Sequence, residues 1–268
     1  MSVSATANHL ARLVAQSQAQ AREREAQVPL EAVRRAAEAS PPPRGFAQAL
    51  LAGSGLIAEV KRSSPSRGAI NPGLDPAALA AAYERGGAAC VSVLTERDSF
   101  GGSLADLAAA RAACALPLLR KDFLVSRYQL YEARAHGAGA ILLIAGAAPL
   151  DVLRDLRALA RALSLSVLFE IHAAAELEEA RACEPDLLGI NARDLRTLLV
   201  HADAFERIAP LASGIAPLVA ESGVRTPADV RRYRALGARA LLVGEALSSA
   251  ADPEAATRAL AQEAAVRS

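Results

Sequence analysis

Residues 56–68 read Leu56-Ile-Ala-Glu-Val-Lys-Arg-Ser-Ser-Pro-Ser-Arg-Gly68, and the pattern that decides the fold begins here. The stretch starts as an apolar run that is too short for a helix, so it predicts a strand. Alternate side chains of a strand share one face, which places Ile57, Glu59 and Lys61 on the same side. The Ser, Pro and Gly residues that follow predict a loop. A carboxylate and an ammonium that leave a strand together before a loop are typical of an active-site rim, although one surface ion pair looks the same.

The same pattern recurs along the chain. Strand-like apolar runs alternate with helix-like segments rich in Ala, Leu, Arg and Glu, which predicts a parallel α/β architecture. Eight such units in about 210 residues favour a closed (β/α)8 TIM barrel over a doubly wound sheet, because the first strand–helix turn lacks the G-x-G-x-x-G fingerprint. The predicted strands are 56–60, 89–94, 116–119, 140–144, 166–171, 187–190, 217–220 and 240–243, and the predicted helices are 76–85, 104–114, 128–136, 150–163, 174–183, 204–211 and 228–236.

The first 45 residues differ from the rest, since they are rich in Ala, Gln and Arg and carry no strand signal. Leu10, Leu13 and Val14 recur at helical spacing, as do Leu30 and Val33, so we expect two amphipathic helices. A poorly ordered tail stays open as the alternative for the first two dozen residues. The triple proline at 41–43 ends this segment. We therefore divide the chain into a helical extension, residues 1–45, and a barrel, residues 46–268.

Composition limits the classes of function. The chain has 268 residues, of which 52% are hydrophobic and 22% charged, so it can build a large core and is not globally disordered. A net charge of +1 with 3% aromatic residues argues against nucleic acid as the main partner. We expect no membrane span, secretory signal or metal, because the apolar runs are short and the histidines scattered. Three cysteines without paired spacing indicate reduced thiols and a cytoplasmic protein.

A barrel predicts that functional side chains gather at the carboxyl ends of its strands. Charged or amide side chains stand at the ends of five of the predicted strands. Buried charges cost several kcal/mol unless they are paired, so a structural origin for the whole set is unfavourable and we interpret it as an active site. The set comprises Glu59, Lys61, Lys121, Glu170, Asn191, Arg193 and Glu221.

Three neighbours of this set are assigned other roles. We expect His172 to orient Glu170 rather than to act as a base. Asp122 faces opposite to Lys121 on the strand and is predicted to be structural, and Cys90 is predicted to be inert.

The last two strands carry a second signal. A Ser-Gly pair, Ser222 and Gly223, follows the seventh strand, and Gly244 follows the eighth before a short helical segment. Loops after strands seven and eight, with free backbone N–H groups at a helix start, form the phosphate site of many barrels. We therefore expect a phosphorylated small-molecule substrate.

Taken together, these motifs resemble the indole-3-glycerol phosphate synthase family of the tryptophan pathway. The matches occur in the family's order between about Arg44 and Asp252, and the ordered set is far more specific than any one of them. They are Ile57-Ala-Glu-Val-Lys-Arg-Ser-Ser-Pro-Ser-Arg-Gly68, Val93-Leu-Thr-Glu96, Phe100-Gly-Gly-Ser-Leu104, Leu119-Arg-Lys-Asp-Phe123, Tyr128-Gln-Leu-Tyr-Glu-Ala133, Leu142-Leu-Ile144, Glu170-Ile-His172, Gly189-Ile-Asn-Ala-Arg-Asp-Leu195, Glu221-Ser-Gly223 and Leu242-Val-Gly-Glu-Ala-Leu247.

The resemblance implies a carboxy-lyase that closes the ring of 1-(2-carboxyphenylamino)-1-deoxyribulose 5-phosphate to indole-3-glycerol phosphate, with loss of CO2 and water and without a cofactor. It also implies that the N-terminal helices pack near the barrel mouth and help to cover the substrate. A monomer is expected.

The resemblance assigns roles residue by residue. Lys121 matches the general acid that protonates the ketone oxygen, and Lys61 positions the substrate carboxylate until CO2 leaves. Glu170 matches the base of the dehydration, supported by Glu59, and Asn191 contacts the reacting end. Substrate contacts are expected from Ser64, Phe100, Phe123, Leu143, Arg193, Leu195 and Glu221, with Arg193 paired to carboxylates in the mouth, and phosphate contacts from Ser222, Gly223 and Gly244.

Two departures from the family pattern are visible. Ala192 replaces a second Asn found in many members, and Glu245 follows Gly244 where some relatives have Ser, so Glu245 is not assigned to the phosphate. Two other interpretations stay open. One is another phosphate-binding barrel enzyme, such as phosphoribosylanthranilate isomerase, and the other is a non-catalytic barrel that binds a phosphorylated ligand.

Overall fold

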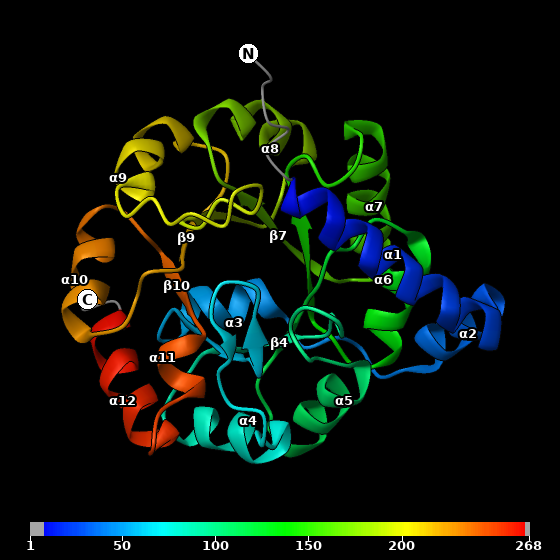
Figure 1. The fold of residues 1–268 in the computed structure, drawn as a ribbon, viewed down its shortest axis with the longest axis horizontal. Helices are drawn as coiled ribbons and strands as arrows, with labels where there is room; N and C mark the ends of the chain where they lie inside the picture. Colours follow the sequence, from blue (N-terminus) through cyan, green and yellow to red (C-terminus); the bar gives the residue numbers. More distant parts are fainter. Residues whose placement is uncertain (1–7, 266–268) are drawn as a thin grey trace.

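The computed structural model describes residues 8–265 and contains, within them, a closed barrel of eight parallel strands (Figure 1). Helices alternate with the strands along the chain, so the predicted (β/α)8 barrel is confirmed. Around the barrel the strand order is β1, β10, β9, β8, β7, β6, β5 and β4. The strands are β1 Leu56–Val60, β4 Cys90–Leu94, β5 Leu118–Lys121, β6 Ala140–Ile144, β7 Ser166–Ile171, β8 Leu187–Asn191, β9 Leu218–Glu221 and β10 Ala240–Val243.

Four strands have the bounds predicted for them, and the others are shifted by one or two residues. The largest shift is in β5, which was predicted at 116–119 and lies at Leu118–Lys121. The strand reaches Lys121 because that residue pairs with Leu94 of β4. This register extends β5 into the polar cluster at the barrel mouth.

Helices surround the barrel, and every helix predicted after a strand is present. Two of the predicted segments begin or end as 3-10 helix, at Ala174–Glu176 and Ala209–Ala212. A small hairpin, formed by β2 Ser63–Ser64 and β3 Gly68–Ala69, lies in the loop after β1. The helices are α4 Pro76–Arg85, α5 Leu104–Ala113, α6 Arg127–Ala135, α7 Leu150–Ala162, α8 Leu177–Cys183, α9 Ala204–Ile208, α10 Pro227–Ala235, α11 Glu245–Ser248 and α12 Pro253–Ala264.

One helix missing from the sequence-based prediction, α3 (Phe46–Ala52), closes the end of the barrel opposite the active site. Phe46 and Leu50 are fully buried and pack with Ile57 and Cys90 inside the barrel. The Cys90 thiol, predicted to be inert, donates to the Phe46 carbonyl at 3.5 Å, and burial raises the pKa of that thiol. The helix α12 was also not predicted, and it packs against α4 and α10.

The core has two layers, because successive strand residues alternate between the barrel interior and the helices. Ile57, Leu119 and Leu168 face inward with the residues on α3. Ala58 and Phe169, their neighbours along β1 and β7, pack outward against the helical shell. This alternation decides which side chains reach the barrel mouth.

The two helices predicted in the extension are present as α1 His9–Gln27 and α2 Leu30–Ala39. Figure 1 shows α1 running across one side of the barrel mouth toward α2 at the edge. α2 packs on α6, where Val33 and Ala37 meet Tyr128 and Tyr131. Residues 1–7 of the proposed extension and 266–268 of the proposed barrel lie outside the described residues.

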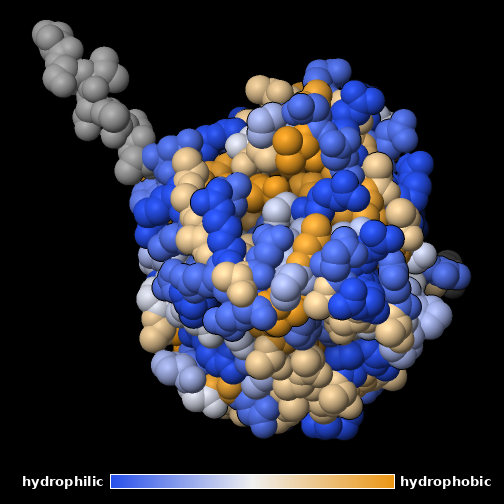
Figure 2. All heavy atoms as spheres, turned by 90° about the vertical axis from the view of Figure 1, so that its right-hand side faces the viewer, coloured by the Kyte–Doolittle hydropathy of each residue, from blue (hydrophilic) through white to orange (hydrophobic). Residues whose placement is uncertain are grey.

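The face that carries α2 is mostly hydrophilic, with apolar residues exposed between the polar ones in its upper half (Figure 2). Within residues 8–265, the exposed large apolar side chains are Val28, Leu150, Leu199, Val200 and Leu211. None of the described helices has the length and apolar character needed to span a bilayer.

Candidate active site

A cavity opens at the carboxyl ends of the barrel strands, and all but two of the predicted site residues line it. The exceptions are Glu170 and Leu143. The loops after β1, β4, β5, β8, β9 and β10 and the helix α1 contribute its walls. The predicted residues that line it are Glu59, Lys61, Ser64, Phe100, Lys121, Phe123, Asn191, Arg193, Leu195, Glu221, Ser222, Gly223 and Gly244.

Lys121 stands at the centre of the charged cluster. Its Nζ lies 3.1 Å from Oε2 of Glu170 and 3.4 Å from Oε2 of Glu221. Both carboxyl groups are buried, and Glu170 lies behind Lys121, outside the lining of the cavity. Neither carboxyl oxygen of Glu221 has a hydrogen-bond partner among the described residues. A lysine and two carboxyl groups thus share one buried position at the end of the strands.

The environment moves the pKa values of this group apart. Burial alone would lower the pKa of Lys121, but the charges of Glu170, Glu221 and Glu59 raise it above its usual value. For Glu170, burial opposes the positive charges of Lys121 and His172, and these hold its pKa well below the usual range. Burial and the nearby charge of Glu170 raise the pKa of Glu221 well above it. The site therefore contains two carboxyl groups whose proton affinities are shifted in opposite directions, lowered at Glu170 and raised at Glu221.

Glu59 and Lys61 form a second pair on β1, with Lys61 Nζ 3.3 Å from Glu59 Oε1. Ser92 of β4 donates to the other oxygen of Glu59 at 3.4 Å. Lys61 and Lys121 are the only lysines in the sequence. The remaining residues of the 30 Lys and Arg are all arginines. Both lysines line the cavity, and a lysine, unlike an arginine, can release its proton.

Two glycines make room for the glutamates. A Cβ on Gly189 would lie 2.1 Å from Oε1 of Glu221, and a Cβ on Gly244 would lie 2.4 Å from Oε1 of Glu59. Both distances are far inside van der Waals contact. Gly189 was not predicted as a site residue, because the side chain for which it makes room, Glu221, lies on the neighbouring strand β9.

Asn191 organises the end of β8. Its Oδ1 accepts hydrogen bonds from Arg193 N at 2.9 Å and Ser222 Oγ at 2.8 Å, which leaves the amide N–H groups as its donors to the cavity. The Arg193 guanidinium donates to the Leu198 carbonyl at 3.0 Å and has no ion pair among the described residues. The expected pairing of Arg193 with carboxylates in the mouth is absent among the described residues, where the guanidinium binds within its own loop, and its contact with substrate stays a prediction.

An apolar side completes the cavity. The rings of Phe100 and Phe123 lie with their centroids 6.1 Å apart, after β4 and β5. The expectation that Leu143 is a wall is wrong, since Leu143 packs in the outer layer against the helices. Its neighbours Leu142 and Ile144 face inward and line the cavity.

A polar chain continues behind Glu170. His172 Nε2 lies 3.0 Å from Oε1 of Glu170, and the His172 Nδ1 lies 3.6 Å from Oε2 of Glu176. Arg196 closes the chain with a 2.6 Å contact to Glu176. Burial lowers the pKa of His172, but the two carboxylates outweigh it and raise that pKa to about 9. His172 is therefore placed to orient Glu170, as expected, and Glu176 and Arg196 are additions that no local motif marks.

The expected phosphate end lies after β9 and β10. Ser222 and Gly223 both adopt positive φ angles, 64° and 84°, which turn their backbone at the cavity wall. Gly244 precedes α11 and lines the same end. Glu245 also lines it, and its Oε1 lies 2.8 Å from Arg67 Nη2.

Sequence reasoning missed several lining residues. Leu13 comes from α1, Arg225 from the loop after β9, and Leu198 and Val200 from the loop after β8. None follows a strand directly, so the rule that predicted the other residues does not reach them. Among the described residues, no three His, Cys, Asp or Glu side chains are grouped as a metal site.

Fold and site together define a (β/α)8-barrel enzyme with a lysine–glutamate cluster at the carboxyl ends of its strands. The family model described as indole-3-glycerol phosphate synthase matches residues 10–260. The chain belongs to the indole-3-glycerol phosphate synthase family.

Similar proteins agree with this assignment. The chain is 52% identical over 237 residues to an indole-3-glycerol phosphate synthase of Nocardioides sp., covering 88% of this chain and 91% of the relative. It is 49% identical over 234 residues to one of Mycolicibacterium smegmatis, covering 87% and 86%. These matches favour the synthase over the isomerase interpretation.

Solved structures show the shared fold alone. Thiamine phosphate pyrophosphorylase from Pyrococcus furiosus has a TM-score of 0.60 at 17% identity, covering 80% of this chain and 97% of the other. A 3-hexulose-6-phosphate synthase has a TM-score of 0.61 at 16% identity, covering 78% and 99%.

Proposed function

We propose that this chain converts 1-(2-carboxyphenylamino)-1-deoxyribulose 5-phosphate to indole-3-glycerol phosphate, with Lys121 as general acid and Glu170 as the base of the dehydration. The observation that carries the proposal is the placement of Lys121 within 3.1 Å of Glu170 and 3.4 Å of Glu221 at the barrel mouth. Groups whose pKa values are pushed apart at one site are the usual sign of an acid–base pair.

The first step requires a proton for the ketone oxygen while the aromatic carbon attacks the carbonyl carbon. Lys121 lines the cavity, and its raised pKa keeps it protonated before the substrate binds. When the substrate binds, it replaces part of the contact between Lys121 and the glutamates. The pKa of Lys121 then falls toward its ordinary value, so the proton can be given up. A positioned acid of this kind contributes about 10²–10⁴-fold.

The following steps lose CO2 and then water. Lys61 holds the substrate carboxylate and stabilises charge until the C–C bond to CO2 breaks, and Glu59 orients Lys61 at 3.3 Å. Glu170, whose pKa is depressed, takes the ring proton, and the hydroxyl leaves as water with a proton from Lys121, which has been reprotonated from solvent. Because Glu170 lies behind Lys121, it reaches the substrate when Lys121 shifts toward the oxygen it protonates.

The remaining residues bind and orient the substrate in this proposal. Asn191 offers its amide N–H groups to the reacting end, and Glu221 contributes a carboxyl group of raised pKa. Ser64, Phe100, Phe123 and Leu195, with Leu142 and Ile144 in place of Leu143, surround the aromatic ring. Arg193 contacts the polar part of the substrate, and Ser222, Gly223 and Gly244 hold the phosphate.

The experiment uses indole fluorescence after addition of this substrate to the purified protein. The chain has no tryptophan, so product appears against a dark background. Wild type should give signal, and Lys121→Met and Glu170→Gln should reduce the rate by about 10²–10⁴-fold. Wild type that is folded and binds the substrate without turnover would overturn the proposal in favour of the non-catalytic barrel.

A conservative variant sharpens the assignment of Lys121. Lys121→Arg keeps a cation between Glu170 and Glu221, but a guanidinium does not give up its proton at ordinary pH. We expect Lys121→Arg to fold and to remain as inactive as Lys121→Met. Activity in Lys121→Arg near that of wild type would show that only the charge is needed.

We further infer a cytoplasmic monomer that needs no nucleic acid. The support is a net charge of +1, scattered exposed apolar side chains and three free, buried cysteines. Light scattering coupled to size exclusion tests the monomer, whose mass is 27.8 kDa.

We also retain residues 1–45 as the extension and 46–268 as the barrel, since α1 and α2 lie outside the barrel wall and α3 begins at Phe46.

A further inference from the structure

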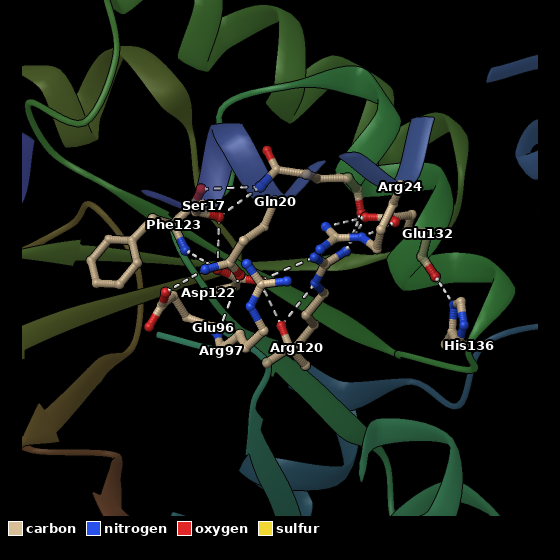
Figure 3. Close-up of polar contacts among 12 residues, drawn as sticks. Ser17, Gln20, Arg24, Glu96, Arg97, Arg120, Asp122, Phe123, Glu132 and His136 are labelled. Carbon is tan, nitrogen blue, oxygen red and sulfur yellow. Dashed lines mark hydrogen bonds and ion pairs between the residues drawn. The ribbon is translucent and has the colours of Figure 1, made fainter. Parts of the chain in front are cut away.

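One buried face of α1 holds two loops of the barrel mouth (Figure 3). Ser17 Oγ donates to Asp122 Oδ1 at 2.9 Å, and Gln20 Nε2 donates to Glu96 Oε1 at 2.8 Å. Ser17 and Gln20 are three residues apart and so share a helix face, and they are 1% and 3% exposed. The loops that they hold follow β5 and β4.

Asp122 connects α1 to the catalytic strand. It lies between Lys121, which faces the glutamates, and Phe123, which lines the cavity. Its Oδ1 also accepts from Phe123 N at 2.8 Å, while Oδ2 accepts from Thr95 Oγ1 at 2.6 Å and Arg120 Nη2 at 3.0 Å. The carboxylate thereby joins α1, β5 and the end of β4, and it sets where the Phe123 backbone leaves the strand.

Glu96 performs the same task in the loop after β4. Its carboxylate accepts from Asp98 N at 3.0 Å and Ser99 N at 2.7 Å, immediately before Phe100. Gln20 adds a second contact, because its Oε1 accepts from Arg97 N at 3.2 Å. The loop that ends in Phe100 is therefore bound to α1 through both ends of the Gln20 amide.

The charges of Arg120, Asp122 and Glu132 are balanced only when Arg24 of α1 is in place. Arg120 is fully buried and pairs with Asp122 and with Glu132 at 3.2 Å. Arg24 of α1 supplies the second cation, donating to both oxygens of Glu132 at 2.5 and 2.9 Å. Because an uncompensated buried charge is strongly unfavourable, this arrangement favours one docked position of α1.

We propose that Ser17 and Gln20 are positioning residues that set the separation of Phe100 and Phe123 and thereby the binding of the aromatic end of the substrate. The proposal rests on the proposed function, since that substrate has an aromatic end and a phosphate end. Phe123 follows β5, whereas the phosphate residues follow β9 and β10, on the far side of the strand order. Loss of either polar contact should therefore weaken the binding of the aromatic end of the substrate and leave the binding of its phosphate end unchanged.

The test compares Ser17→Ala and Gln20→Ala with Glu23→Ala in the full chain. Glu23 lies on the same helix and pairs with Arg97 at 3.2 Å, but both side chains are more than half exposed, so it is a matched control. Inhibition by anthranilate reports on the aromatic end, and inhibition by inorganic phosphate reports on the other. Steady-state kinetics, thermal melting and far-ultraviolet circular dichroism complete the set.

We expect Ser17→Ala and Gln20→Ala to lower kcat/KM by about tenfold and to weaken anthranilate while leaving phosphate inhibition unchanged. Ser17→Thr, which keeps the hydroxyl, should restore most of the loss, and Glu23→Ala should behave as wild type. Wild-type kinetics in both alanine variants would overturn the inference. Equal weakening of anthranilate and phosphate would also overturn it, because that result indicates a general loss of structure. Absence of turnover in wild type would instead refute the proposed function.

Discussion

His172 Nε2 lies 3.0 Å from Oε1 of Glu170, and both side chains are buried behind the cavity. Glu176 approaches the other ring nitrogen, so two carboxylates face His172, and each is also paired with a further cation, Glu170 with Lys121 and Glu176 with Arg196. The imidazole is therefore held as a cation that points the proposed base toward Lys121. The folded protein holds this proton more tightly than the unfolded chain, so the unfolding free energy depends on pH.

Replacement of His172 by Gln should destabilise the protein in a pH-dependent way. The pKa of His172 is raised from 6.5 to about 9 in the folded state, so its stabilisation is complete below pH 6.5 and is lost as pH rises through 9. A tenfold change in proton affinity corresponds to about 1.4 kcal/mol, which sets an upper limit of about 3 kcal/mol. Urea unfolding of wild type and His172→Gln at pH 6 and pH 10 measures it. A difference in unfolding free energy that is the same at both pH values would contradict this account.

Replacement of Glu221 by Gln should stabilise the protein, whereas replacement of His172 should destabilise it. Burial and the charge of Glu170 raise the pKa of Glu221 well above its usual value, so the folded state binds this proton more tightly than the unfolded chain. As pH rises above about 4.5, the unfolded chain releases this proton while the folded protein still holds it, so the unfolding free energy falls. Since Gln resembles the protonated acid, Glu221→Gln should be more stable than wild type at pH 8 and equal to it at pH 4. Thermal melts at the two pH values test this, and a variant less stable at pH 8 would refute it.

A methyl group on Gly189 should disturb the same cluster from the neighbouring strand. Its Cβ would lie 2.1 Å from Oε1 and 3.2 Å from Cδ of Glu221, and overpacking of this kind costs about 1–3 kcal/mol. Gly189→Ala should therefore lower the unfolding free energy, and the shorter acid in Gly189→Ala/Glu221→Asp should recover part of it. Gly73→Ala is the matched control, because a Cβ there meets nothing within 4 Å. Equal stability of the Gly189 and Gly73 variants would show that the barrel yields without cost.

Most of the charged site was predictable because a polar residue near the end of a strand shows which alternate residues of that strand face the barrel interior. Glu59 and Glu170 each lie two residues after an inward-facing apolar residue, and the alternation places them correctly. β6 has no such marker, since Ala140–Ile144 is apolar and buried on both faces. Leu143 was expected inside from the family resemblance, and without a marker the alternation could not show that Leu142 faces inward instead. A shift of one residue moves a side chain to the other face.

Contacts between distant segments could not be predicted in the same way. Ser17 and Asp122 are 105 residues apart, and nothing in either local sequence indicates the other. Asp122 was expected to be structural, and its carboxylate does bind Ser17, Thr95 and Arg120, but the residue also lines the cavity and its partner on α1 depends on where the helix docks. α3 was missed because its seven residues are too short to show a helical period.

Glu245 should weaken substrate binding at the phosphate end. Its carboxylate lines the cavity beside Gly244, where the dianionic phosphate is proposed to bind, and it engages Arg67 at 2.8 Å. Glu245→Ser removes a like charge and frees the Arg67 guanidinium, so KM should fall by about fivefold at low salt with little change in kcat. Glu254→Ser changes the net charge equally at an exposed pair with Arg85 and should leave KM unaltered. The two KM values are to be measured at low and high ionic strength, because screening should reduce the effect of Glu245→Ser. An unchanged or higher KM in Glu245→Ser would mean that the Arg67–Glu245 pair supports phosphate binding rather than opposing it.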